Sequence, residues 1–433
     1  MASIFRVCTR PLRQMRKPSS AAPTPAYQHN NNNNNHHHHT ACKKFHTIDS
    51  SKLVEEESLP FYKPELFYPA HIGEVLNDKY QIVGKLGYGD LSTVWLCRDL
   101  QNGRQYVSLK VCTTEASKHD QEVRVYTHLN SIKSSHPGTR YIRQVYDMFE
   151  VSGPHGRHSC LVHPPMHLNL LEFMRKTPTK RLNKTLLKLT LQYLLEALDF
   201  LHTEGDIVHT DLKSDNIMLS IADESVLDDF SQAEMRDPVP RKIIDETRTI
   251  YTSRALRDPA ENNWGPPVLC DFGEARIGKI HKVTDPGEAQ PHIYRAPEVS
   301  FMMPWDSKID IWNVPNLIWD LFESDHLFSN TDRNGSYCPY THMAKIVALL
   351  GPPPPEFVAR SGYSKNCFDE TGKWAPNDAV DIPAGCTLEN AEVHMADKEK
   401  ELFLHFIRSM LKWLPEERKT ASELLQDPWL RLE

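Results

Sequence analysis

The sequence predicts an α+β protein with two lobes, a small β-rich lobe followed by a larger and mainly helical one. Residues 79–86, 92–100 and 104–112 alternate or run apolar, are rich in β-branched and aromatic residues, and flank a glycine turn. This pattern is typical of an antiparallel meander. Residues 117–132 change to helical spacing, and helical patterns dominate after residue 165.

The clearest helix is predicted over residues 183–205. Its leucines recur on one stripe, and Gly205 is placed to stop it. The stripe consists of Leu187, Leu191, Leu194, Leu198 and Leu201. We divide the chain into a tail (1–48), an extension (49–79) and a domain (80–430) with an N-lobe (80–163), a C-lobe (164–430) and an insert at about 221–266.

Charge is unevenly distributed along the 433 residues. Residues 1–48 contain seven Lys or Arg and no Asp or Glu, so with a total of −7 the remainder carries −14. An acidic body disfavours direct binding of nucleic acid, which needs clustered cations. It suits a basic protein substrate, although an acidic surface also simply aids solubility.

Two absences limit the function classes further. No apolar run approaches the ~20 residues needed to cross a bilayer, so no membrane span is expected. The nine cysteines form no C-x-x-C pair and most lie in apolar runs, which favours reduced thiols in an intracellular protein.

The first 28 residues have the composition of a mitochondrial transit peptide, because they are Arg-rich, free of acids and dotted with small residues. Pro11 interrupts the helix that such a signal prefers, and a disordered basic tail is the alternative. The Asn/His run at 29–39 has no pattern that could pack a core.

Two features of the β-rich part favour phosphate binding. Gly87 and Gly89 lie in a strand–turn–strand, where the missing Cβ atoms let backbone N–H groups approach phosphate oxygens, although an ordinary hairpin would look the same. Lys110 lies mid-strand between apolar neighbours. It is either a snorkelling edge residue or the ion partner of Glu122 on the following helix.

Two later motifs add catalytic groups. In HTDLKSDN, Asp211 can accept the proton of an attacking hydroxyl, Lys213 can neutralise phosphoryl charge, and Asn216 can ligate a divalent cation. In VLCDFGEAR, Asp271 ends an apolar strand and is a carboxylate suited to Mg²⁺. The joint occurrence of all four features in this order indicates phosphoryl transfer.

With these motifs, residues 79–430 resemble eukaryotic protein serine/threonine kinases. The resemblance extends to YRAPEV (294–299), DIW (310–312) and the segment at 411–430. It implies that Arg418 pairs with Glu298. Within the CMGC group of kinases, the chain is most similar to the SR-protein kinases, which phosphorylate serine/arginine-rich splicing factors. The similarity lies in the residues that lead into the first strands, in Ser92, which stands in place of the third glycine of the loop, and in the HTD motif.

The resemblance implies a bilobal kinase fold that uses ATP and Mg²⁺ to phosphorylate Ser/Thr hydroxyls of Arg/Ser-rich proteins in mRNA processing and signalling. It implies a monomer in the cytoplasm and nucleus; the mitochondrion is the alternative location. The implied catalytic residues are Asp211, Lys213, Lys110 and Glu122, with metal ligands Asn216 and Asp271. The implied nucleotide contacts are Leu86, Gly87, Gly89, Val94, Lys110 and Met166, the last following the proline-rich hinge His163-Pro164-Pro165.

Thr210 stands where many kinases carry an Arg that binds a phosphate on the activation loop. The loop at 278–291 offers only Thr284 as an acceptor, so we hypothesise constitutive activity with the loop held by packing. Pro315 is expected to kink its helix. A scaffold that binds partners without transferring phosphate is the alternative to an active enzyme.

The insert reads as an acidic amphipathic helix followed by loop with one short strand. It either docks a substrate or partner, or is a passive surface insert.

Overall fold

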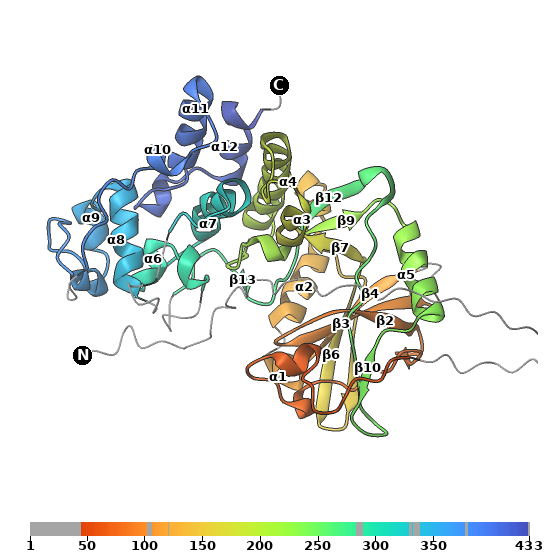
Figure 1. Cartoon of the computed structure of the whole chain (residues 1–433). Coiled ribbons are helices and arrows are strands. Elements are labelled where there is room, and N and C mark those ends of the chain that lie inside the picture. The colour runs from red at the N-terminus through yellow and green to blue at the C-terminus, as the bar shows by residue number, and fades with distance from the viewer. Residues whose placement is uncertain are drawn as a thin grey trace, which may run out of the picture.

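The computed structural model describes residues 45–101, 106–119, 121–282, 289–328, 331, 338–376 and 380–431. These form a β-sheet lobe and a helical lobe, drawn at the lower right and upper left of Figure 1. The predicted α+β, two-lobed fold is confirmed. The basic tail up to residue 44 and Thr284 lie outside the described residues. In the part described, no helix combines the length and the apolar character that a membrane crossing requires.

The small lobe is built on a six-stranded antiparallel sheet in the order β1-β2-β3-β4-β6-β5. Its strands are β1 (Val75–Leu76), β2 (Tyr80–Gly89), β3 (Ser92–Asp99), β4 (Val107–Cys112), β5 (Asp147–Gly153) and β6 (Gly156–His163). The predicted meander is β2, β3 and β4. Strand β1 comes from the extension, and two residues are too few to show a strand period in sequence.

Helices α1 (Thr114–His119) and α2 (Gln121–Ser131) follow β4. Tyr126 and Leu129 of α2 are buried, as the helical spacing predicted, whereas Glu122 lies in its first turn. The helix therefore packs its apolar face into the protein.

The large lobe is mainly helical. Its helices are α3 (Leu170–Lys176), α4 (Lys184–Thr203), α6 (Pro297–Ser300), α7 (Lys308–Ile318), α8 (Pro339–Leu350), α9 (Pro355–Val358), α10 (Leu388–Ala391), α11 (Asp397–Arg408) and α12 (Ala421–Leu425). All five leucines of the predicted α4 stripe are buried in the main core. Pro315 lies inside α7, and the helix continues past it into a π-helical turn, Trp319–Glu323.

Two small sheets contain the strands that lead into the motif residues. Strands β7 (Met166–Asn169), β9 (Ile217–Ile221) and β12 (Trp264–Leu269) pair in the order β12-β9-β7. Strand β8 (Ile207–Val208) pairs with β13 (Arg276–Ile277). The HTD motif thus follows β8, and Asp271 comes two residues after the end of β12, so the catalytic groups of both motifs stand just beyond a paired strand.

The insert between β9 and β12 returns to the small lobe (Figure 1). It forms α5 (Ser225–Arg236) and a hairpin of β10 (Arg241–Ile243) and β11 (Thr249–Tyr251). The predicted acidic helix is confirmed, whereas the single strand is a correction: there are two, which satisfy each other's backbone groups. Phe230 of α5 packs so close to β2 that a Cβ on Gly84 would lie 2.8 Å from its ring.

The insert and the extension meet at Lys85, a fully buried residue of β2. Its Nζ donates to the carboxylate of Glu56, from the extension, and to the carbonyl of Tyr251, from the insert, at 3.1 Å. The backbone N–H of Arg254 donates to the Lys85 carbonyl at 2.9 Å. Two segments that the sequence presents as peripheral therefore fix the strand that carries the glycine turn.

Candidate active site

Lys110 and Glu122 form an ion pair within the small lobe. Lys110 lies in β4, opposite Val94 of β3 and Leu161 of β6. Its Nζ lies 2.6 Å from Oε2 of Glu122, in the first turn of α2, where a negative charge also suits the helix dipole. This pairing confirms the prediction that Glu122 is the partner of Lys110 and overturns the edge-residue alternative.

Asp271 approaches the same ammonium group from the segment after β12. Its Oδ1 lies 3.6 Å from Lys110 Nζ. The residue adopts φ 64°, a left-handed conformation that is uncommon outside glycine. Lys110 and Asp271, far apart in sequence, therefore face each other.

The charges in this cluster stabilise one another. Lys110 lowers the pKa of Asp271, whose side chain is 51% exposed, to about 2, against a smaller opposing effect of desolvation. Burial alone would lower the pKa of Lys110, but the carboxylates of Glu122 and Asp271 outweigh it and the pKa is raised. At neutral pH the lysine is therefore positive and Asp271 negative.

Asp211, Lys213 and Asn216 form a second cluster in the loop after β8. Lys213 Nζ lies 2.6 Å from Asp211 Oδ2, and Asn216 Nδ2 donates to the same oxygen at 2.9 Å. The Asn216 carbonyl in turn accepts from the N–H of Cys270 at 2.8 Å. The second cluster is therefore bonded to the residue before Asp271, and the two clusters are neighbours.

Asp310 of α7 anchors this loop, a role that our reading of the sequence missed. Its fully buried carboxylate accepts from the backbone N–H of His209 at 2.8 Å and from that of Thr210 at 2.9 Å. His202 Nε2 lies 2.9 Å from the same carboxylate. The available signal was the DIW motif, which we used only as a family marker.

Phe272 connects α2 with the loop after β8. Its buried ring lies edge-on to Tyr126 of α2, with centroids 5.4 Å apart, and to His209, with centroids 5.2 Å apart. The residue after Asp271 is thus fixed by aromatic packing from both lobes.

The glycine turn consists of the end of β2, with Gly87 and Gly89, and the turn residues Asp90 and Leu91, and it leaves room around the glycine backbone. Gly87 pairs with Val94, and a Cβ on Gly87 or Gly89 would meet nothing within 4 Å. Leu86, just before the turn, packs partly against the cluster that includes α5. The turn therefore has the open backbone that a phosphate would need, as predicted from sequence.

The hinge ends at Met166, the buried first residue of β7. Met166 packs with Val268 and Cys270, and Met218 adds a partly buried contact. Arg143 Nη2 donates to the hinge carbonyl of Pro164 at 3.5 Å. The predicted adenine-facing residue thus lies in an apolar cluster directly before Asp271.

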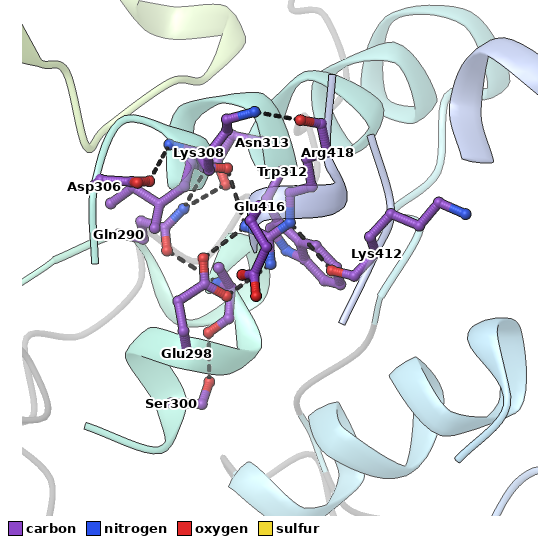
Figure 2. A network of polar contacts seen from close by, with 12 residues as sticks. Gln290, Glu298, Ser300, Asp306, Lys308, Trp312, Asn313, Lys412, Glu416 and Arg418 are labelled. Atoms are coloured by element: carbon purple, nitrogen blue, oxygen red, sulfur yellow. Dashed lines mark hydrogen bonds and ion pairs between the residues drawn. The ribbon is translucent and has the colours of Figure 1, made fainter. Parts of the chain in front are cut away.

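The segment with YRAPEV is held by a buried ion pair (Figure 2). The guanidinium of Arg418 binds the carboxylate of Glu298 through two bonds of 2.6 and 2.7 Å. This confirms the pairing predicted from sequence. Nearby, Gln290 Nε2 donates to Asn313 Oδ1 at 2.8 Å, and its Oε1 accepts from Ala296 N–H at 2.9 Å. Neutral and charged bonds together fix this segment to α7.

The donor set suits a magnesium ion shared with phosphates. Asn216 uses its amide nitrogen on Asp211, which leaves the amide oxygen as its ligating atom, and Asp271 is an ionised carboxylate. Among the described residues no three His, Cys, Asp or Glu side chains group as a metal site. Mg²⁺ commonly takes only one or two protein ligands, with waters and substrate phosphates as the rest.

These features define a protein kinase, and comparison with known proteins agrees. The family model described as "Protein kinase domain" matches residues 80–252 and 260–430, and the chain belongs to this family. A solved kinase-domain structure superposes with a TM-score of 0.61 at 22% identity, covering 84% of this chain and 99% of the other, which supports the fold.

Curated relatives narrow the class. The chain is 42% identical over 387 residues to a serine/threonine protein kinase of Aspergillus fumigatus, covering 89% of this chain and 93% of the relative. It is 29% identical to serine/threonine-protein kinase SRPK of Physarum polycephalum (87% and 91% covered) and 24% identical to human SRSF protein kinase 3 (87% and 90%). The chain is therefore a serine/threonine protein kinase similar to the SR-protein kinases, and protein kinases of this fold use ATP and Mg²⁺.

Proposed function

We propose that the chain transfers the γ-phosphoryl group of ATP to Ser or Thr hydroxyls of basic, Arg/Ser-rich proteins, including those of mRNA processing and signalling. The observation that carries the phosphotransfer is the approach of Lys110 Nζ to Asp271 Oδ1, at 3.6 Å, beside the Asp211 cluster. It brings a cation, a metal-binding carboxylate and a proton acceptor together.

Each group has a role in this proposal. Lys110, held by Glu122, binds the α- and β-phosphates, and the Gly87–Gly89 turn, with Leu86 and Val94, covers the nucleotide. Asp211 orients the attacking hydroxyl and takes its proton as the oxygen attacks the γ-phosphorus and ADP leaves. Lys213 offsets the charge of the transferring group. Such catalysis is mainly positioning and electrostatics.

Asp271 and the amide oxygen of Asn216 would hold Mg²⁺. When bound, the ion neutralises phosphate charge. Met166 supplies the N–H that binds adenine, because Pro164 and Pro165 before it have no N–H to donate.

Acidic groups near the YRAPEV segment support a basic substrate. Burial raises the pKa of Tyr294, and the nearby carboxylates of Asp320, Asp215 and Asp211 raise it further. Tyr294 also donates its hydroxyl to Asp320. A peptide with arginines beside its serine would be attracted here.

Labelled-phosphate transfer tests the proposal. Wild-type protein with Mg-ATP should label an Arg/Ser peptide, and a matched peptide with Glu in place of Arg should be a much poorer acceptor. Asp211→Ala should lose transfer yet still bind nucleotide. Nucleotide binding without transfer by the wild type would favour the scaffold alternative, and equal labelling of both peptides would refute the substrate class.

We also propose that activity needs no phosphate on the loop. Thr210 cannot make the bidentate contact with phosphate that Arg makes. Activity should survive phosphatase treatment, and a tenfold or larger gain on phosphorylation of Thr284 would contradict this.

For the cell, we propose residence in cytoplasm and nucleus. Import into mitochondria is the alternative, given the basic first 28 residues. Fractionation of a C-terminally tagged chain decides between them, because import would shorten the protein from its N-terminus.

A further inference from the structure

Two consecutive carbonyls after Asp271 accept hydrogen bonds from two different parts of the protein. Thr210 Oγ1 donates to the carbonyl of Glu274 at 2.8 Å. Gln121 Nε2 donates to the carbonyl of Ala275 at 2.6 Å. The first donor lies next to Asp211 and the second lies next to Glu122, so each joins this segment to a residue of the candidate site.

Thr210 holds a conformation that its residue type disfavours. It is buried and has φ 66°, in the left-handed region, which is a true outlier for a β-branched side chain. Its N–H is fixed by Asp310 and its hydroxyl by Glu274. Strain of this kind persists only where the surroundings impose it, and it clusters at functional sites.

Gln121 is oriented by a neighbour on its own helix. Arg124 Nη2 donates to Gln121 Oε1 at 2.9 Å, which leaves the amide nitrogen to face Ala275. Arg276 also donates to the carbonyls of Glu274 and Ala275, at 2.6 and 3.3 Å. Those bonds stay within the segment, whereas Thr210 and Gln121 tie it to other elements.

We propose that Thr210 and Gln121 are positioning residues that form a neutral clamp on the carbonyls of Glu274 and Ala275. The clamp holds Asp211 and α2, with Glu122, in fixed relation to Asp271, and both donors that reach the segment from other elements are neutral. Thr210 therefore has a positioning role that does not depend on a phosphate on the loop. The inference rests on the proposed function and adds residues to it.

The test compares Thr210→Val and Gln121→Leu, which remove one donor each at nearly constant size, with Thr210→Ser, which keeps the hydroxyl. We express kcat relative to the concentration of nucleotide-binding sites, so that unfolded protein does not count. For Thr210→Val and Gln121→Leu it should fall about fivefold to tenfold, because each loses one neutral hydrogen bond of about 1 kcal/mol. Thr210→Ser should recover to within twofold of wild type. Values within twofold for both single variants, or no recovery with Ser, would overturn the clamp.

A control variant and a second readout separate the clamp from general effects. Thr127→Val removes a hydroxyl bond to Val123 on the exposed side of α2 and should leave kcat unchanged. Amide hydrogen exchange at Arg276 and Ile277, in β13, should quicken in Thr210→Val but not in Thr127→Val. Exchange needs no catalysis, so it tests the clamp even if the wild type transfers no phosphate; unchanged exchange would contradict it.

Discussion

Replacing Arg418 by Met should destabilise the large lobe strongly. Its side chain is 0% exposed and that of Glu298 is 1% exposed, and the two share bonds of 2.6 and 2.7 Å. Arg418 Nη1 and Nε also donate to the carbonyls of Lys308 and Lys412. Because Met leaves the Glu298 carboxylate buried without its partner, we expect a loss of about 3–5 kcal/mol in the free energy of unfolding.

Urea denaturation followed by tryptophan fluorescence measures this loss. The double variant Arg418→Met, Glu298→Leu should be milder than the single variant, because it removes the unpaired charge as well. Arg360→Met is the matched control, since the Arg360–Glu416 pair nearby is 40% and 58% exposed and should contribute about 0–1 kcal/mol. A cost for Arg418→Met no larger than that for Arg360→Met would contradict the penalty expected for breaking the buried pair.

Three further predictions follow from single contacts. Lys110→Met should raise the pKa of Asp271 from about 2 towards its ordinary value, and a carboxyl NMR titration would show this shift. In the wild type, the ionised Asp271 stabilises the fold above about pH 4, and this stabilisation is lost as the pH falls through about 2. Burial raises the pKa of Glu323 to about 7, so the free energy of unfolding should fall as the pH rises through about 7. Glu323→Gln should remove this pH dependence in urea melts, and an unchanged pH dependence would refute the prediction. Gly84→Ala should lower the free energy of unfolding by about 1–3 kcal/mol, because the new Cβ would lie 2.8 Å from the ring of Phe230. Adding Phe230→Leu should restore part of this loss, and no loss in Gly84→Ala would contradict the packing of α5 against β2.

The sequence was sufficient for the groups whose position depends on local structure. Lys110 lies in strand β4 and Asp211 lies in the loop between β8 and β9, so the position of each side chain depends mainly on the strands next to it in sequence. The α4 stripe was equally clear, because its helical period alone determines which side is buried.

Partners that meet only in three dimensions were not predictable in this way. Nothing near Lys85 in sequence indicates that Glu56 and the Tyr251 carbonyl will surround it. The hairpin of the insert was missed because its strands have three residues each, too few to show a period. Thr210 was interpreted through the arginine that it replaces, whereas its hydroxyl bond to Glu274 depends on the left-handed backbone that the structure shows.

The proposed mechanism requires five side chains to act together on one magnesium nucleotide: Lys110, Glu122, Asp211, Asn216 and Asp271. Its most direct test is the rate of ³²P transfer from [γ-³²P]ATP to an Arg/Ser peptide by wild type, Asp211→Asn and Asp271→Asn. We expect transfer by the wild type and a loss of at least about 100-fold in both variants, because a general base and an electrostatic partner of the phosphates each contribute about that factor or more. Asp211→Asn should retain nucleotide binding. Transfer at the wild-type rate by either variant would contradict it.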